Sequence, residues 1–255
     1  MTLEIFTIPC LQDNYAYLLH DIPSGKVGLV DAPEEGPIRN ALSERGWGLD
    51  LILITHHHDD HISAVDALRA SFDARVVGAA ADRHRLPPLD IEVAEGDVVE
   101  LSESAAEVLE VSGHTMGHIA FYFPTASAVF TADSLMAMGC GRLFEGTAEK
   151  MWESLSKLSR LPKDTMIYSG HEYTEANARF AASIDGDNPA LQDRNARILE
   201  ARRNGAPTVP SRLDDELATN PFLRATAPEM KANVNMKGAA DVDVFAEIRR
   251  RKDAF

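Results

Sequence analysis

The sequence predicts an α/β fold that is followed by an all-helical region. Short apolar or alternating runs recur up to about residue 170 and predict strands, because turn residues separate them. Segments with apolar residues at helical spacing lie between these runs, and past His171 only helical segments remain. No Gly/Ser-rich linker joins the two regions. We therefore expect an α/β domain over residues 1–170 and a helical domain over residues 171–255 that docks closely on it.

The first domain begins with three strands that we expect to form an antiparallel meander. Turn residues separate apolar runs at 3–8, 15–20 and 27–31. A helical segment at 37–45 stops at Gly46, a residue type that favours the left-handed conformation found at helix ends. The remaining predicted elements are strands at 51–54, 75–78, 98–101, 107–111, 119–123, 128–131 and 166–168, and helices at 62–72 and 147–161.

Four helices are predicted in the second domain, at residues 174–184, 189–203, 212–218 and 241–251. The second of them has clear boundary signals. Asn188 is a good N-cap, Pro189 suits the first helical position, and Gly205 follows the end.

Composition excludes several classes of protein. Among the 255 residues, no stretch approaches the length of about 20 apolar residues that a membrane span needs, and residues 1–10 lack the pattern of a signal peptide. Two cysteines, Cys10 and Cys140, rule out a disulfide framework, so we expect a cytoplasmic protein. The net charge of -15 argues against nucleic-acid binding. Against this acidic background, the basic run at residues 249–252 stands out.

Histidines and aspartates crowd into residues 55–61 (THHHDDH), directly after the predicted buried strand 51–54. In extended backbone His56 and His58 point the same way, so both imidazoles can reach one ion. Asp60 and His61 follow as the chain turns. These are more ligands than one tetrahedral site needs from so short a segment, which indicates a site for two metal ions. A solvated turn in which an aspartate caps the next helix explains one aspartate, but not the alternating histidines.

Three more candidate ligands follow predicted strands, as the first cluster does. They are His114, Asp133 and His171, and a carboxylate can bridge two ions, which makes Asp133 the natural bridge. His57 falls between the alternating ligands and should point away. His118 lies one helical turn after His114, and it either joins the ligands or supports them. His20 and His84 have no such setting, and we expect both cysteines to be packing residues.

The motif T-H-x-H-x-D-H with the later His, Asp and His resembles the metallo-β-lactamase superfamily. Further segments resemble its glyoxalase II (hydroxyacylglutathione hydrolase) branch: residues 13–15 (DNY), 139–146 (GCGRLFEG), 169–174 (SGHEYT), 220–222 (NPF) and 249–255 (RRRKDAF). The resemblance implies a four-layer αββα sandwich with a small all-α C-terminal domain that binds the substrate. It implies hydrolysis of S-(R)-lactoylglutathione to glutathione and D-lactate, the second step of methylglyoxal detoxification.

The resemblance also implies roles for individual residues. One metal ion would be bound by His56, His58 and His114, and a second by Asp60, His61 and His171, with Asp133 bridging. The glutathione moiety would be held by Arg142, Leu143, Phe144, Tyr173, Arg249 and Lys252. At this loop the family often has Lys-Phe-Tyr, whereas here it reads Arg142-Leu143-Phe144, so the hydroxyl of the tyrosine is missing.

Thioester hydrolysis suits such a site. Metal ions lower the pKa of bound water from ~15.7 towards ~7, and a thiolate with a pKa of ~8.5 leaves with little help. We expect a hydroxide between the two ions, with Asp60 orienting it. Zinc is the first choice, and iron or manganese would also accept these ligands. We expect a monomer whose partner is a small glutathione thioester, with no nucleic acid and no membrane.

Four other functions are compatible with parts of the pattern. A persulfide dioxygenase of the same superfamily would hold one iron, but the full ligand set and the helical domain argue against it. A lactonase or RNA-processing nuclease is disfavoured by the basic tail and by the acidic net charge, respectively. A purely structural metal site would close its coordination with protein ligands, whereas seven ligands for two ions leave room for water.

Overall fold

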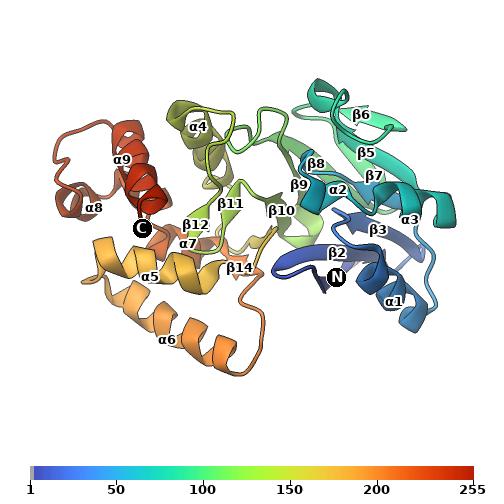
Figure 1. Cartoon of the computed structure of the whole chain (residues 1–255), viewed down its shortest axis with the longest axis horizontal. Coiled ribbons are helices and arrows are strands. Elements are labelled where there is room, and N and C mark those ends of the chain that lie inside the picture. Colours follow the sequence, from blue (N-terminus) through green and yellow to red (C-terminus); the bar gives the residue numbers. More distant parts are fainter. Residues whose placement is uncertain (1–2) are drawn as a thin grey trace. The chain divides into compact units, whose positions relative to one another are not determined.

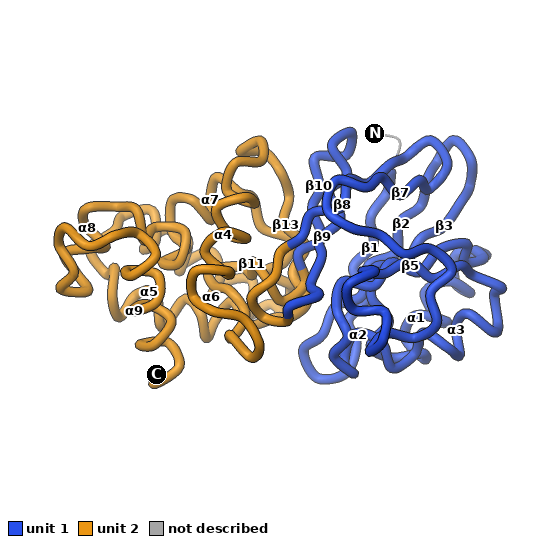
Figure 2. The backbone as a smooth tube through the Cα atoms, turned by 90° about the horizontal axis from the view of Figure 1, so that it is seen from above, with its two compact units in different colours: residues 1–110, 116–131 blue, residues 111–115, 132–255 orange. Residues whose placement is uncertain are grey.

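The computed structural model describes residues 3–255, and its chain forms two compact units. Unit 1 comprises residues up to 110 and residues 116–131, and unit 2 comprises residues 111–115 and 132–255 (Figure 2). Each unit is a part of the chain whose residues contact mainly one another. The predicted domain boundary at 170/171 was instead placed where strands give way to helices, and it stays a prediction. Residues 1–2 of that first predicted domain lie outside the described part.

Unit 1 contains a six-stranded mixed sheet in the order β1-β2-β3-β4-β5-β6. The predicted meander is confirmed, since β1 (Leu3–Cys10), β2 (Asn14–Asp21) and β3 (Lys26–Val30) pair antiparallel. Three parallel strands continue the sheet: β4 (Leu51–Leu53), β5 (Arg75–Ala79) and β6 (Ile91–Val93). The sequence did not predict β6, because only Val93 of its three residues is buried, so the strand has no alternation of buried and exposed residues.

Two helices cover one face of this sheet. Helix α1 (Glu35–Arg45) buries Ile38 and Leu42, and α3 (Val65–Phe72) buries Val65 and Leu68, against apolar residues of β1 to β5. The predicted stop of α1 is confirmed, because Gly46 has a φ of 66°.

The predicted helix 62–72 is confirmed from Val65 onward as α3, and a separate short helix that was not predicted, α2 (Asp59–Ile62), precedes it. The backbone of Ala32 explains the break, since its N–H donates to His61 O (2.7 Å) and its carbonyl accepts from Ala64 N (2.9 Å). Asp60 and His61 therefore lie in a short helix rather than in an open turn.

The second sheet element of unit 1 consists of four antiparallel strands in the order β10-β9-β8-β7. They are β7 (Val98–Leu101), β8 (Ser104–Glu110), β9 (Ile119–Phe123) and β10 (Ala128–Ala132). Tyr17 of β2 meets Phe130 of β10 with ring centroids 5.4 Å apart, and Leu101 fills the space beside Gly28. Unit 1 therefore has a helical layer and two packed sheet layers.

Unit 2 is mainly helical (Figure 1). Its helices are α4 (Ala148–Leu158), α5 (Thr174–Asp185), α6 (Pro189–Arg203), α7 (Leu213–Thr219), α8 (Pro228–Asn233) and α9 (Asp241–Asp253). Its strands are the hairpin β11 (Leu135–Met136) and β12 (Gly139–Cys140) and the pair β13 (Met166–Ser169) and β14 (Ser211–Arg212).

The boundary signals of α6 are confirmed. Asn188 Oδ1 accepts from the backbone N–H groups of Ala190 (3.1 Å) and Leu191 (3.4 Å), and Pro189 occupies the first helical position. Helices α5 and α6 pack side by side around Ala181 and Ile198. Helix α8 and strands β11, β12 and β14 were not predicted, because elements of two to six residues carry too little periodicity. Over residues 3–255, no helix has the length and apolarity that a membrane span requires.

Candidate metal centre

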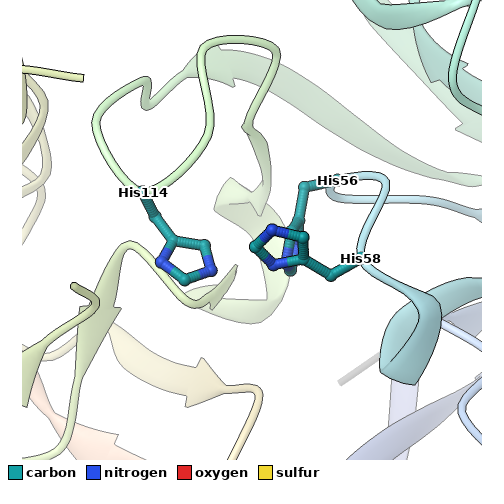
Figure 3. Close-up of side chains that lie close together, drawn as sticks. All are labelled: His56, His58 and His114. Carbon is teal, nitrogen blue, oxygen red and sulfur yellow. The ribbon is translucent and has the colours of Figure 1, made fainter. Parts of the chain in front are cut away.

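The loop after β4 presents two histidines with neighbouring ring nitrogens. Ile54 continues the strand pairing by donating to Val77 O (2.9 Å), and His58 keeps an extended backbone before α2. His56 Nε2 and His58 Nδ1 lie 3.1 Å apart, as their alternation along the chain predicts. Figure 3 shows both rings, together with the side chain of His114 from unit 2.

Helix α2 carries the next two candidate ligands. Asp60 Oδ2 lies 3.7 Å from His61 Nε2. The amide of Asn14 orients Asp60, because its Nδ2 lies 3.0 Å from both the backbone carbonyl and Oδ2 of that residue. No sequence pattern indicates this role for Asn14, since β2 and α2 meet only in the folded chain.

Asp31, at the end of β3, orients His61 from the other side. Its Oδ2 lies 2.8 Å from His61 Nδ1, and its two oxygens also accept from the Thr55 N–H (2.9 Å) and hydroxyl (2.8 Å). Ligand atoms of Asp31, His56 and His61 all lie within 4.8 Å of one another. Because three donors already occupy its carboxylate, Asp31 fits an orienting partner that leaves His61 Nε2 for an ion. The signal that selected Asp133, an aspartate ending a strand, could have found it.

The remaining histidines of this region have supporting positions. His57 points away as predicted, with its Nδ1 2.8 Å from Asp82 Oδ2. The ring of His118 stacks on that of His56, with centroids 4.5 Å apart and planes 12° apart. This contact favours the supporting role for His118 that the sequence left open.

Unit 2 carries the other three candidate ligands around one carboxylate. Asp133 Oδ2 lies 3.3 Å from His114 Nε2, and Asp133 Oδ1 lies 3.3 Å from His171 Nε2. His114 Nδ1 lies 2.9 Å from the carbonyl of Arg142, which turns Nε2 towards Asp133. All three side chains are buried. Each oxygen of Asp133 therefore faces a different histidine, which is the arrangement of a bridging carboxylate.

The separations within each unit fit shared metal ligands. Nitrogen and oxygen ligands about 2.0–2.1 Å from a tetrahedral zinc lie about 3.3–3.4 Å from each other. The pairs His56–His58, His114–Asp133 and His171–Asp133 have separations of 3.1, 3.3 and 3.3 Å. Neutral imidazoles and carboxylates are ligands that zinc, iron and manganese accept. The donor set therefore fits divalent cations.

Two of the predicted substrate-binding residues lie beside these ligands in unit 2. The ring of Phe144 is 5.2 Å from that of His114, and Tyr173 stacks on His171 with centroids 4.6 Å apart. Both aromatic side chains are exposed. Arg142 is also exposed, and Leu143 is half-buried.

The basic tail forms the end of α9, and its two predicted binding residues differ in setting. Arg249 is buried, donates to Cys140 O (3.0 Å) and lies over the ring of Phe222. Lys252 Nζ is half-buried and lies 3.3 Å from Ala176 O. Burial, with the neighbouring charge of Arg249 as the next cause, lowers the pKa of Lys252 to about 8. Both residues remain predictions as substrate ligands, and Arg249 in addition anchors α9 to β12.

The two cysteines are buried, as expected of packing residues. Burial raises the pKa of the Cys10 thiol to about 12 and that of Cys140 to about 11. Neither thiol therefore provides a nucleophilic thiolate at neutral pH.

Two family models together match nearly the whole chain. One, described as the metallo-beta-lactamase superfamily, matches residues 14–171, and the other, described as the hydroxyacylglutathione hydrolase C-terminus, matches residues 172–255. The hydroxyacylglutathione hydrolase of Cereibacter sphaeroides is 63% identical over 255 residues, which are 100% of both chains. The chain belongs to the hydroxyacylglutathione hydrolase family. The resemblance stated from the sequence motifs is thereby confirmed.

Solved structures agree with the fold of a hydroxyacylglutathione hydrolase family member. ETHE1 from Myxococcus xanthus has a TM-score of 0.68 at 24% identity, covering 98% of this chain and 90% of that one. A di-iron-bound form of TTHA1623 has a TM-score of 0.57 at 29% identity, covering 66% of this chain and 91% of that one. The predicted α/β metallo-β-lactamase fold, with two sheets and a helical C-terminal region, is confirmed.

Proposed function

We propose that this protein hydrolyses S-(R)-lactoylglutathione and related 2-hydroxyacylglutathiones to glutathione and the free hydroxy acid. The assignment of the substrate rests on the 63% identity to a hydroxyacylglutathione hydrolase over the full length of both chains. The observation that supports the reaction is the set of His and Asp donors, which fits divalent cations. In this function the protein performs the second step of methylglyoxal detoxification.

The proposed ligands divide into two sets of three with a shared carboxylate. His56, His58 and His114 would bind one ion, and Asp60, His61 and His171 would bind the other. Every residue of these two sets offers one nitrogen or oxygen as a ligand atom. Asp133 would bridge the ions, which its two oxygens facing different histidines support. Zinc is the first choice. Iron is the alternative, because a structural neighbour at 29% identity binds two iron ions.

Bound divalent cations would supply Lewis acidity, which lowers the pKa of water and polarises a carbonyl. Asp60 is the residue we propose to orient the attacking water. Its side chain is 42% exposed, so water can reach it, and Asn14 holds it in one orientation. A thiolate leaving group needs little protonation, since an ordinary thiol has a pKa of ~8.5. No side-chain nucleophile is then required.

The substrate-binding groups that we propose are all in unit 2. Glutathione thioesters carry carboxylates, and an acidic protein needs local cations to bind them. Arg142, Arg249 and Lys252 would supply these. Phe144 and Tyr173 would provide an apolar surface beside His114 and His171, and Leu143 would add to it. A monomeric, cytoplasmic protein remains our expectation.

The test is to follow the loss of thioester absorbance of S-lactoylglutathione with purified protein and to measure metal content in the same sample. Hydrolysis with two metal ions per chain is the expected result. No hydrolysis with two ions bound would contradict the substrate and leave other thioesters or lactones. One bound iron and consumption of dioxygen would instead favour a dioxygenase.

A matched pair of variants tests the bridge. Asp133→Ala should lose much of the bound metal, because it removes a ligand from both ions. Asp187→Ala, which truncates an exposed aspartate of the same unit, should retain it. Full metal retention by Asp133→Ala would remove Asp133 as the bridge.

A further inference from the structure

The hairpin of β11 and β12 lies between two parts of the metal centre in unit 2. Asp133 precedes it, and Gly141 and Arg142 follow it. The base of the hairpin is tight, because Gly141 N donates to Ser134 O (3.1 Å) and a Cβ at Gly141 would lie 2.0 Å from Asp133 O. The carbonyl of Arg142 in turn bonds His114. A shift of this hairpin would therefore move Asp133 and the partner of His114 together.

The hairpin cannot hold this position by its own pairing. Only Leu135–Cys140 and Met136–Gly139 pair across it, and an isolated two-stranded hairpin is marginally stable at best. Its turn residue Met138 has a φ of 60°, which is unusual for a residue with a side chain. External contacts must therefore hold it in place.

Buried side chains of the helical segments supply those contacts at five consecutive residues. Asn220, at the end of α7, donates from Nδ2 to Met136 O (3.2 Å) and Gly139 O (2.9 Å). Asn177 of α5 donates to Ala137 O (3.1 Å). Two further contacts complete the set, Met138 N to Glu216 Oε2 (2.9 Å) and Arg249 to Cys140 O (3.0 Å).

A buried ion pair between Arg194 and Glu216 orients the side chains that contact the hairpin. Glu216 is 0% exposed, and its Oε1 accepts from Arg194 of α6, which also donates to Thr219 Oγ1 (2.6 Å). Glu216 Oε2 accepts from Asn220 Nδ2 (3.0 Å) as well as from Met138 N. A buried carboxylate with all its donors in place has one allowed position, because any displacement leaves a charge unpaired.

We propose that Asn220, Asn177 and Glu216, with Arg194 behind them, are positioning residues for the metal centre. They act through the backbone of residues 136–140, which lies between Asp133 and the carbonyl of Arg142 that orients His114. None of the four is itself a ligand. The inference builds on the proposed dinuclear site, but its main readout is metal release, which does not require that the thioester be the substrate.

The test compares three asparagine truncations in the metal-loaded protein. Asn220→Ala removes both carbonyl contacts, and Asn177→Ala removes one. Asn188→Ala is the matched control, because Asn188 bonds helix backbone and Asp185 but not the hairpin. Metal release to an excess of chromogenic chelator is followed well below the unfolding temperature of each variant, and kcat and KM are measured on the same preparations.

We expect Asn220→Ala to release metal about 10-fold faster and to lose about 10-fold in kcat, as removal of outer partners of metal ligands does elsewhere. Asn177→Ala should show about a 5-fold effect, the equivalent of one buried hydrogen bond. Asn188→Ala should lower the unfolding temperature and leave metal release unchanged.

Two results would overturn the inference. One is wild-type metal release in both hairpin variants. The other is equally fast release in Asn188→Ala, which would indicate loss of stability alone. Should Asn220→Ala fail to fold, the milder Asn177→Ala decides. If the wild type retains its metal but hydrolyses no thioester, the proposed function fails while the comparison of metal release still stands.

Discussion

Replacement of Asp31 by asparagine is the sharpest test of how unit 1 orients its ligands. The carboxylate of Asp31 accepts from the Thr55 N–H and hydroxyl and from His61 Nδ1, at 2.8–2.9 Å. Asparagine keeps the shape of the side chain but exchanges one acceptor oxygen for an NH2 group, which only donates. The three donors around this side chain then have one acceptor oxygen available instead of two.

The cost follows from the two ways in which the amide can lie. With its NH2 group towards His61, Nδ1 must accept and the ring proton moves to Nε2, the atom predicted to bind the ion. With the amide turned over, the buried N–H of Thr55 loses its acceptor, which costs about 1–3 kcal/mol. Metal binding requires this second arrangement. At 1.4 kcal/mol per factor of ten, zinc affinity should fall about 10- to 100-fold.

The assay is competition for zinc with a chromogenic chelator at neutral pH. Asp50→Asn is the matched control, since Asp50 also accepts from a strand N–H (Val27, 2.9 Å) and from a side chain (Lys26, 2.6 Å) at the other end of β4. It should bind zinc as the wild type does. Wild-type zinc affinity in a folded Asp31→Asn variant would refute the reasoning, because His61 would then need no carboxylate to present Nε2.

Three further predictions concern catalysis and substrate binding. Asn14→Ala should lower kcat about 10- to 100-fold in steady-state assays, because Asp60 loses the amide that orients it, and an unchanged kcat would contradict this. Since the pKa of Lys252 is lowered to about 8, its ammonium is present below that pH and lost above it. The KM for the anionic thioester should therefore rise as pH increases through about 8, and Lys252→Arg should flatten that profile, whereas a flat wild-type profile would exclude the contact. Phe144→Tyr adds a hydroxyl on an exposed ring, which can form one hydrogen bond to the peptide part of glutathione. That bond should lower KM about 2- to 10-fold at unchanged kcat, and an equal KM would show that no such bond forms.

Much of the fold could be predicted from local pattern. The meander, α1 with its stop at Gly46, and α6 between Asn188 and Gly205 all follow from periodicity and from residues whose conformational preferences act within one turn. The elements that escaped prediction, such as β6 and the β11–β12 hairpin, are too short to carry a period. Strand β6 forms by pairing with β5, and the hairpin is held by side chains of distant helical segments.

The candidate ligands could likewise be selected from the sequence, because each follows a strand and His56 and His58 alternate. The sequence alone thus determined the residue types, the family motifs and the direction of the first two histidines. The side chains that hold them come together only on folding: Asp31 lies 30 residues from His61, Asn14 lies 46 residues from Asp60, and Asn220 lies 81 residues from Gly139. Periodicity reports which face of an element is buried, but a hydrogen bond between distant side chains depends on their positions in space, which only the packed sheets and helices provide.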